Sequence, residues 1–284
     1  MQIRSMEKVL DSLSGRMLSF DLTLPNHPVP AGGYPVLVFA HGFKGFKDWG
    51  FWYRFAEFFA SEGFAFLKFN FAWNGTTAGN LLEFSDLEAF GNNNFSRELA
   101  DLQSVLAWIS GPGREYGLNP EEISLLAHSR GGPVALITAA ENPGIRSVLT
   151  WGSVESLGYA WFDEEELRRW KEDGVLFIHN ARTAQQMPLY YQLFEDFQRN
   201  SSRFSPDRYR EITCPVLLIH GTADAVVPFH SAKNINARIR DSRVHLLEGA
   251  DHVFGGRHPI GPEEELPGQA VELLEKSLEF LRGK

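Results

Sequence analysis

Six short apolar runs spaced along the chain constrain its fold more than any other feature. Each run is four to six residues long and is bounded nearby by Gly, Pro, Asn, Asp or Ser. Hydrophobicity within the runs is continuous rather than alternating, which is typical of central strands that are covered on both faces. The predicted strands are 36–40, 64–69, 123–127, 148–151, 216–219 and 244–247.

Helical patterns separate most of these runs. Apolar residues recur at three- to four-residue spacing over 99–109, with Asn94 or Ser96 as the capping residue, and again over 270–281. Strands that alternate with helices predict βαβ units, and therefore an α/β fold with a mainly parallel sheet and helices on both faces. The stretch 10–24 alternates loosely around a Ser-Gly pair and predicts an antiparallel hairpin at the edge of the sheet.

The alternation stops for about sixty residues, between positions 153 and 213. Asp163 can cap a helix that runs to Gly174, and the rest of the stretch is rich in aromatic and polar residues. A long excursion between two core strands is usually functional or disordered, and the aromatic content indicates order. We therefore expect one domain over 1–284, with a small cap-like insertion at 153–213 over the carboxyl edge of the sheet.

Composition and charge exclude several classes of function. The net charge of −9 and the pI of about 5.5 disfavour a nucleic-acid partner, because the chain repels phosphates at long range. No apolar run approaches the roughly 18 residues that a membrane span needs. The single cysteine, Cys214, cannot form an intramolecular disulfide, and the N-terminus lacks the pattern of a signal peptide, so we expect a cytoplasmic protein. No nucleotide-binding or metal-ligand motif is present, and no cofactor or metal is expected.

The most informative motif is Ala127-His-Ser129-Arg-Gly131. A predicted strand leads into Ser129 and a helical segment leads out of it, which matches the G-x-S-x-G nucleophile elbow with Ala127 in the first glycine position. Such a turn strains the backbone at the serine and brings the residues two before and two after it together, so only small side chains fit. We interpret Ser129 as a nucleophile; an ordinary helix cap is the alternative.

A serine at its ordinary pKa is a weak nucleophile and needs a general base. His252 follows the last apolar run in a loop with small residues on both sides, which suits an imidazole that must point inwards. His258 is its main rival, whereas His245 lies inside a predicted strand. The other histidines are interpreted as shaping the site through hydrogen bonds (His41 and His128) or as structural or surface residues (His27, His179, His220 and His230).

The base in turn needs a carboxylate that fixes its tautomer and stabilises its charged form. Asp224 follows the run 216–219, so it lies at the carboxyl end of a core strand and between the serine and the histidine in the sequence. The alternative for Asp224 is a turn aspartate that caps a helix near Pro228. Asp251 is adjacent to the histidine, which makes the required contact difficult, and Glu248 is a weaker alternative.

Acyl transfer also needs two N–H groups that point at the developing oxyanion. Arg130, the residue after the nucleophile, is expected to donate one. The glycine-containing loop 41–45 follows an early strand, and Phe43 is the expected second donor. The alternative is an ordinary glycine-rich loop with no catalytic role.

Together these motifs resemble the α/β-hydrolase superfamily. They are most similar to the dienelactone hydrolase-like branch of small bacterial carboxylesterases, including cinnamoyl and feruloyl esterases with a His-Gly-Phe oxyanion loop. The resemblance covers residues 16 to 283 approximately, with the four motifs in the family's order. It implies the α/β-hydrolase fold, with Ser129, Asp224 and His252 as the triad and Phe43 and Arg130 as oxyanion donors. Dienelactone hydrolases proper use a cysteine nucleophile, whereas this chain has a serine.

The expected function is that of a serine hydrolase, a carboxylesterase that cleaves small-molecule esters through an acyl-enzyme. A thioesterase, amidase or peptidase could use the same triad, and a non-catalytic binding protein could use the same fold. The aromatic residues at 49–53 and 71–73 either line an acyl pocket or pack in the core. Residues 153–213 could also form a partner or homodimer surface.

Overall fold

The computed structural model describes residues 3–77, 79–80, 82–158, 162–261 and 263–283. Three positions of the predicted insertion, 159–161, therefore lie outside the described residues, as do both ends of the predicted domain. None of the helices in the described ranges combines the length and the apolar character that crossing a bilayer requires.

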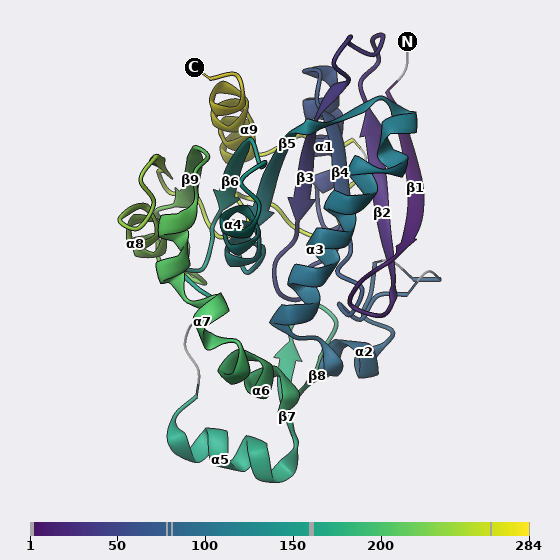
Figure 1. Ribbon diagram of the computed structural model, residues 1–284. Helices are drawn as coiled ribbons and strands as arrows, with labels where there is room; N and C mark the ends of the chain where they lie inside the picture. The colour runs from purple at the N-terminus through teal and green to yellow at the C-terminus, as the bar shows by residue number, and fades with distance from the viewer. Residues whose placement is uncertain (1–2, 78, 81, 159–161, 262, 284) are drawn as a thin grey trace.

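An eight-stranded sheet forms the centre of the molecule (Figure 1). Its strands lie in the order β1-β2-β4-β3-β5-β6-β9-β10. β1 and β2 form an antiparallel hairpin and β2 is antiparallel to β4, while every other neighbouring pair is parallel. All six apolar runs fall on strands of this sheet, so the predicted mainly parallel α/β fold is confirmed. The strands are β1 (Arg4–Asp11), β2 (Met17–Leu24), β3 (Tyr34–Ala40), β4 (Ala65–Phe69), β5 (Leu118–His128), β6 (Ser147–Trp151), β9 (Val216–Gly221) and β10 (Ser242–Leu247).

Helices cover both faces of the sheet, because the side chains of each central strand alternate between two buried clusters. In β3, Val36 and Val38 pack into one cluster, whereas Leu37 and Phe39 pack into the other. Burial on both faces is the reason that the runs are continuously apolar. Helices α1 (Trp52–Ser61) and α9 (Gly268–Leu281) cover one face, and α3 (Phe95–Ser110), α4 (Gly131–Glu141) and α8 (His230–Asn236) cover the other.

The two candidate caps of α3 have different roles. The Asn94 side chain accepts a hydrogen bond from the Arg97 N–H at 2.9 Å, so Asn94 is the cap. Ser96 lies inside the helix and its hydroxyl donates to Asp196 at 2.6 Å. Since Asp196 belongs to the stretch between β6 and β9, this bond ties α3 to that stretch.

The chain between β6 and β9 projects from the sheet beyond the carboxyl ends of its strands (Figure 1). Asp163 caps the first helix in a reciprocal capping box with Glu166, and Gly174 ends it with a φ of +73°. The buried Trp170 anchors this helix to the next hairpin, because its indole N–H donates to Leu189 O at 2.7 Å. The elements are α5 (Glu164–Asp173), the antiparallel pair β7 (Val175–Asn180) and β8 (Gln185–Tyr190), α6 (Gln192–Arg199) and α7 (Ser201–Phe204); α2 (Leu87–Asn92) of the core packs against β8.

Candidate active site

Ser129 lies at the turn between β5 and α4, at the carboxyl edge of the sheet. Its φ of +54° is in the left-handed region, which residues other than glycine rarely adopt. The Ser129 N–H donates to Trp151 O at 2.9 Å, and the Gly132 N–H donates to Ser129 O at 3.0 Å. A Cβ at Gly131 would lie 2.5 Å from Ala40 O, so only glycine lets α4 pack this closely against the end of β3.

A chain of side-chain contacts leads away from the serine. His252 Nε2 lies 3.0 Å from Ser129 Oγ, and His252 Nδ1 lies 2.7 Å from Asp224 Oδ2. Burial opposes ionisation of Asp224, but hydrogen bonds from His220, His252 and the backbone hold the pKa of this carboxyl well below its usual range. A charged carboxylate keeps the proton on His252 Nδ1, which leaves Nε2 as an acceptor toward the serine hydroxyl.

The alternative base and acids contact other groups. His258 Nδ1 accepts the Gly50 N–H at 2.9 Å. Asp251 accepts two backbone N–H groups of its own turn, at 3.1 and 2.8 Å, and Glu248 is exposed. His245 on β10 lies 3.5 Å from an acidic side chain of α9. Among the described residues, no three His, Cys, Asp or Glu side chains are grouped as metal ligands would be.

His41 and His128 are buried beside this group and bond to its backbone. His41 Nδ1 donates to Gly42 O at 2.9 Å, and its Nε2 accepts the Phe71 N–H at 3.3 Å. His128 Nε2 donates to His252 O at 2.9 Å. Burial lowers the pKa of His41 to about 4, and burial together with electrostatic repulsion by the protonated form of His252 lowers the pKa of His128 to about 3. Both rings are therefore neutral near pH 7 and hold loops in place.

The loop after β3 lies directly against the serine. A Cβ at Gly42 would lie 2.8 Å from Ser129 Cβ, so the backbone of the loop occupies that space. Within the described part of the chain, neither the Phe43 N–H nor the Arg130 N–H donates a hydrogen bond. The Arg130 guanidinium stacks over the Phe43 ring at 4.2 Å, which links the two residues whose N–H groups are free.

A largely buried group of four charged side chains connects the loop after β3 to the sheet. Lys47 donates to Asp21 of β2 at 2.9 Å and to Asp48 at 2.6 Å. Lys68 of β4 pairs with the same two carboxylates. Each lysine contacts both aspartates and each aspartate contacts both lysines, so every ion of the group has two partners of opposite charge. This group fastens the loop to two strands of the sheet.

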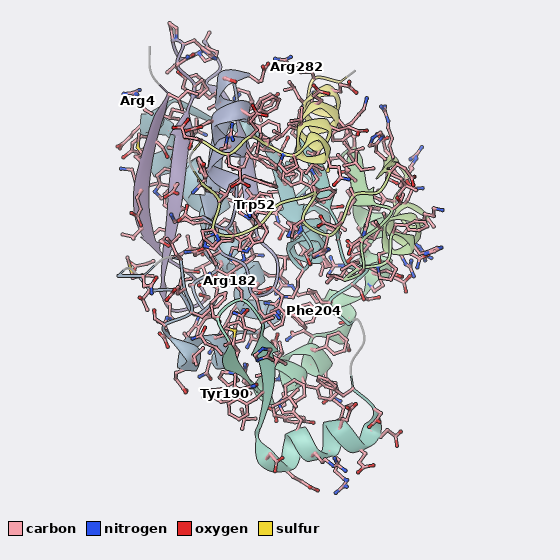
Figure 2. The ribbon with its side chains drawn as sticks, turned by 180° about the vertical axis from the view of Figure 1, so that it is seen from behind. Arg4, Trp52, Arg182, Tyr190, Phe204 and Arg282 are labelled. Atoms are coloured by element: carbon pink, nitrogen blue, oxygen red, sulfur yellow. The ribbon has the colours of Figure 1, made fainter. Side chains whose placement is uncertain are left out.

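A cavity of about 390 Å³ opens above the serine, within the size range of small-molecule sites. Trp49 and Trp52 line it from the core, whereas Phe51 packs in the core, so the aromatic stretch 49–53 contributes to both the cavity and the core. Asn180 and Arg182 line it from the β7–β8 hairpin. Figure 2 shows Arg182 between the core and the outer part of the stretch that follows β6. Two parts of the chain thus form the cavity.

The sequence model of the alpha/beta hydrolase family matches residues 37–261, which include Ser129, Asp224 and His252 and all residues that line the cavity. The chain belongs to the alpha/beta hydrolase family. The predicted resemblance and fold class are therefore confirmed.

Relatives of the chain include a protein named as a serine hydrolase and one named as an esterase. Serine hydrolase BPHL of Mus musculus is 29% identical over 147 residues, which cover 46% of this chain and 49% of that protein. Esterase LipC of Mycobacterium tuberculosis is 25% identical over 242 residues, 80% of this chain and 54% of that protein. The chain thus spans about half the length of these curated relatives. Est1E of Butyrivibrio proteoclasticus, in a structure with ferulic acid bound, superposes with a TM-score of 0.70 at 18% identity over 98% of this chain and 100% of that chain.

Four residues near the site were not predicted from the sequence to belong to it. His220 is fully buried, and its Nε2 lies 2.9 Å from Val227 O and 3.2 Å from Asp224 Oδ2. Gly152 adopts a φ of +55° against the histidine–carboxylate pair. The only feature of the sequence that could have indicated His220 and Gly152 is their position at the carboxyl end of a predicted strand. Asn180 and Arg182 carried no signal, because the stretch from which they come shows no regular pattern.

Proposed function

We propose that this hydrolase is a serine carboxylesterase in which Ser129 is the nucleophile, His252 the general base and Asp224 the orienting acid. The observation that carries the proposal is the unbroken path from Ser129 Oγ through the imidazole to the Asp224 carboxylate, at 3.0 and 2.7 Å. The strained backbone of the serine supports it, since strain of this kind concentrates at functional sites.

In the proposed reaction, Ser129 Oγ attacks the ester carbonyl while His252 Nε2 takes the hydroxyl proton. The N–H groups of Phe43, on the loop after β3, and of Arg130, next to the nucleophile, stabilise the oxyanion, because neither has another acceptor among the described residues. His252 then gives the proton to the departing alcohol. Water, deprotonated by the same imidazole, attacks the acyl-enzyme and releases the carboxylic acid.

We also propose that residues 153–213 are an insertion within a single domain and act as one wall of the substrate cavity. Their hairpin lines the cavity, and Ser96 and Asp196 bond the insertion to core helix α3. The core would then supply the reacting groups and the insertion would supply contacts with the substrate.

The test is hydrolysis of 4-nitrophenyl esters of two, four, eight and twelve carbons by the wild type and by Ser129→Ala. We expect kcat to fall by about 10⁶-fold in the variant, because nucleophile and base act as a unit. Ser201→Ala, at an exposed serine of α7, is the matched control and should behave as the wild type. A Ser129→Ala protein as active as the wild type would show that another group is the nucleophile.

The same triad could cleave thioesters or amides, so the leaving group must be varied as well. Matched thioester and anilide substrates with the best acyl chain separate carboxylesterase from thioesterase, amidase and peptidase activity. A folded wild type that hydrolyses none of these substrates would favour a binding protein on the same fold.

A further inference from the structure

The charges that line the cavity are unusual for so acidic a chain. The net charge of the protein is −9, yet Lys44 and Arg182 line the cavity and, in the described part of the chain, no carboxylate does. Asp224 lies behind His252 and is paired with it. The charge of Arg182 adds to burial in lowering the pKa of His258, another lining residue. The cavity is therefore a region of positive potential next to the reacting serine.

Arg182 is exposed in the β7–β8 turn, and the charge of the Glu83 carboxylate acts on its guanidinium from beyond salt-bridge distance. It lies over the rings of Phe46 and Phe84, at 5.4 and 5.9 Å, and its only hydrogen bond to a described residue is to Leu82 O at 3.5 Å. No salt bridge joins it to any described carboxylate. The two rings hold the planar group at the cavity while leaving its N–H donors available.

Asn180 supplies a second unused donor in the same hairpin. Its side chain is 6% exposed, and its Nδ2 has no hydrogen-bond partner within the described residues. Its Oδ1 accepts the backbone N–H of Arg182 at 3.3 Å, which fixes the orientation of the amide and leaves Nδ2 without a partner among the described residues. Buried donors are almost always bonded, so an acceptor is missing here.

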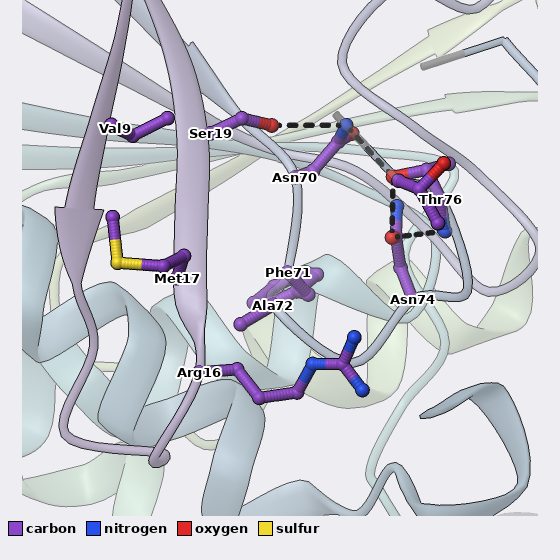
Figure 3. A pocket seen from close by; sticks show the side chains of 10 residues that line it. Val9, Arg16, Met17, Ser19, Asn70, Phe71, Ala72, Asn74 and Thr76 are labelled. Atoms are coloured by element: carbon purple, nitrogen blue, oxygen red, sulfur yellow. Dashed lines mark hydrogen bonds between the residues drawn. The ribbon is translucent and has the colours of Figure 1, made fainter. Parts of the chain in front are cut away.

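A second hollow of about 330 Å³ beside the β1–β2 hairpin provides a contrast (Figure 3). There Asn70 donates to Thr76 at 3.1 Å, and Thr76 donates to Asn74 at 2.8 Å. Arg16 is paired with Asp86 at 2.7 Å. The polar side chains of that hollow are paired with one another or with Asp86, whereas Asn180 Nδ2 has no partner among the described residues and the Arg182 guanidinium has only Leu82 O.

We infer that Arg182 and Asn180 form a carboxylate subsite, so that the enzyme prefers esters that carry a free carboxylate elsewhere in the molecule. A carboxylate fits both donors: the guanidinium fork binds it in a planar, bidentate manner, and one oxygen can also accept the amide N–H. Lys44 adds positive charge from the facing loop. This inference rests on the proposed esterase function and specifies its substrate class.

The experiment compares esters that differ only by the negative charge. For a carboxylate on the acyl side, the pair is mono-4-nitrophenyl adipate and methyl 4-nitrophenyl adipate. For a carboxylate on the alcohol side, the pair is 3-(4-acetoxyphenyl)propanoate and its methyl ester, in which two methylene groups insulate the leaving phenol. The readout is the ratio of kcat/KM for the acid to kcat/KM for its methyl ester, since a general loss of activity cancels in this ratio.

In the wild type we expect a ratio of about ten or more for at least one pair. Arg182→Met should lower that ratio at least fivefold, because it removes the fork, and Arg182→Lys should restore part of it. Arg168→Met is the matched control on exposed helix α5 and should keep the wild-type ratio. Ratios near or below one for both pairs, or a preference that survives in Arg182→Met, would overturn the subsite and leave the esterase proposal intact. Failure to hydrolyse either member of both pairs, by a protein that hydrolyses the unsubstituted 4-nitrophenyl esters, would overturn the subsite alone; failure on all of these esters would overturn the two proposals together.

Discussion

The edge of the sheet and the β7–β8 hairpin meet at the cavity, and they differ in how far their polar groups are hydrogen-bonded within the protein. At the edge of the sheet, Ser129, His252 and Asp224 are bonded to one another, and the neighbouring buried histidines are bonded to backbone. In the β7–β8 hairpin, Asn180 Nδ2 has no acceptor among the described residues, and the exposed Arg182 guanidinium donates only to Leu82 O, at 3.5 Å, within that part of the chain. The Ser129, His252 and Asp224 side chains are therefore preorganised without a ligand. In our proposal, Asn180 and Arg182 gain their hydrogen-bond acceptor only when a ligand binds.

The difference teaches how a shared fold can acquire a particular substrate. Groups that must react at fixed geometry are best held by a rigid sheet edge, because small displacements are costly in rate. Groups that select a substrate can lie on an insertion, whose sequence can change without disturbing the sheet. Substitutions in the core should therefore affect all substrates alike, and substitutions in the hairpin should affect them unequally.

Among the substitutions that test this comparison, the largest expected effect is that of Asp224→Asn. Without the carboxylate, His252 loses the group that fixes its tautomer and stabilises its charged form, and we expect kcat to fall by about 10⁴-fold. The measurement is kcat for both members of an acid and methyl-ester pair. Equal losses on the two substrates would support the division between core and hairpin, and a loss confined to one of them would break it.

Next in size is the stability lost by placing a methyl group at the elbow. In Gly131→Ala the new Cβ would lie 2.5 Å from Ala40 O and 2.8 Å from His41 O, both backbone atoms, so we expect a loss of about 3 kcal/mol. Gly174→Ala, at the end of α5, meets no atom within 4 Å and only has to adopt a φ of +73°, for about 1–2 kcal/mol. Urea unfolding compares the two variants; a larger loss at Gly174 would show that the insertion is the more tightly constrained part.

These two glycines also indicate what the sequence could predict. The elbow at Ser129 and the cap and end of α5 were predictable, because small residues and capping residues act over a few positions of the chain. The strands were predictable because burial on both faces requires continuous apolar runs. These are properties of local sequence.

The β7–β8 hairpin of the insertion could not be predicted, because the local sequence signals that mark the other elements are absent from it. Its turn, 181–184, contains neither Gly, Asn nor Pro, and the left-handed position is taken by Ala184 with a φ of +54°. The usual signal of a tight turn is therefore missing. Likewise, His220 gave no sign of its contact with Asp224, because a strand-end histidine has the same sequence whether it faces solvent or a carboxylate.

The third prediction concerns stability in acid, which should fall because of the buried histidines of the core. Their pKa values are lowered in the folded state, to about 3 for His128 and about 4 for His41. Below pH 6.5, these two histidines therefore bind protons in the unfolded chain but remain neutral in the folded chain. Their contribution to the free energy of unfolding keeps its full value above pH 6.5 and decreases as the pH falls toward 4, by up to about 1.4 kcal/mol per pH unit for each ring.

His128→Asn is the variant that tests this assignment, with urea unfolding at pH 7.5, 6 and 5 as the measurement. Its stability should fall less steeply with acid than that of the wild type. Asp101 acts in the opposite direction, because burial raises its pKa to about 6 and its folded-state proton adds stability as the pH falls through 6. The wild-type slope is thus a net value, and the difference between the two slopes is the relevant quantity; equal slopes would show that His128 does not contribute.

The fourth prediction is that His220 is a positioning residue that acts through Asp224. His220→Leu removes the N–H that lies 3.2 Å from Asp224 Oδ2, and we expect kcat to fall about tenfold with KM little changed. His220→Gln, which can place an N–H near the same point, should recover part of the loss. In the Asp224→Asn background the His220→Leu substitution should cost little more; full additivity would show that His220 acts independently of the carboxylate.

The smallest expected effect is that of Lys44→Met on the preference for acidic esters. Lys44 lines the cavity from the loop after β3, so it belongs to the core, yet by charge it should act with the hairpin. Its ammonium is a strongly hydrated point charge on a flexible stem and already lies 3.4 Å from His179 O, so it gives attraction without the planar fit of Arg182. We expect the ratio of acid to methyl ester to fall about twofold, in keeping with a partly exposed charge, and about 0.5 M salt to remove most of this effect. A fall as large as that of Arg182→Met would move the centre of the carboxylate subsite from the insertion to the oxyanion loop, and selection of the substrate would then lie in the same part of the molecule as the chemistry.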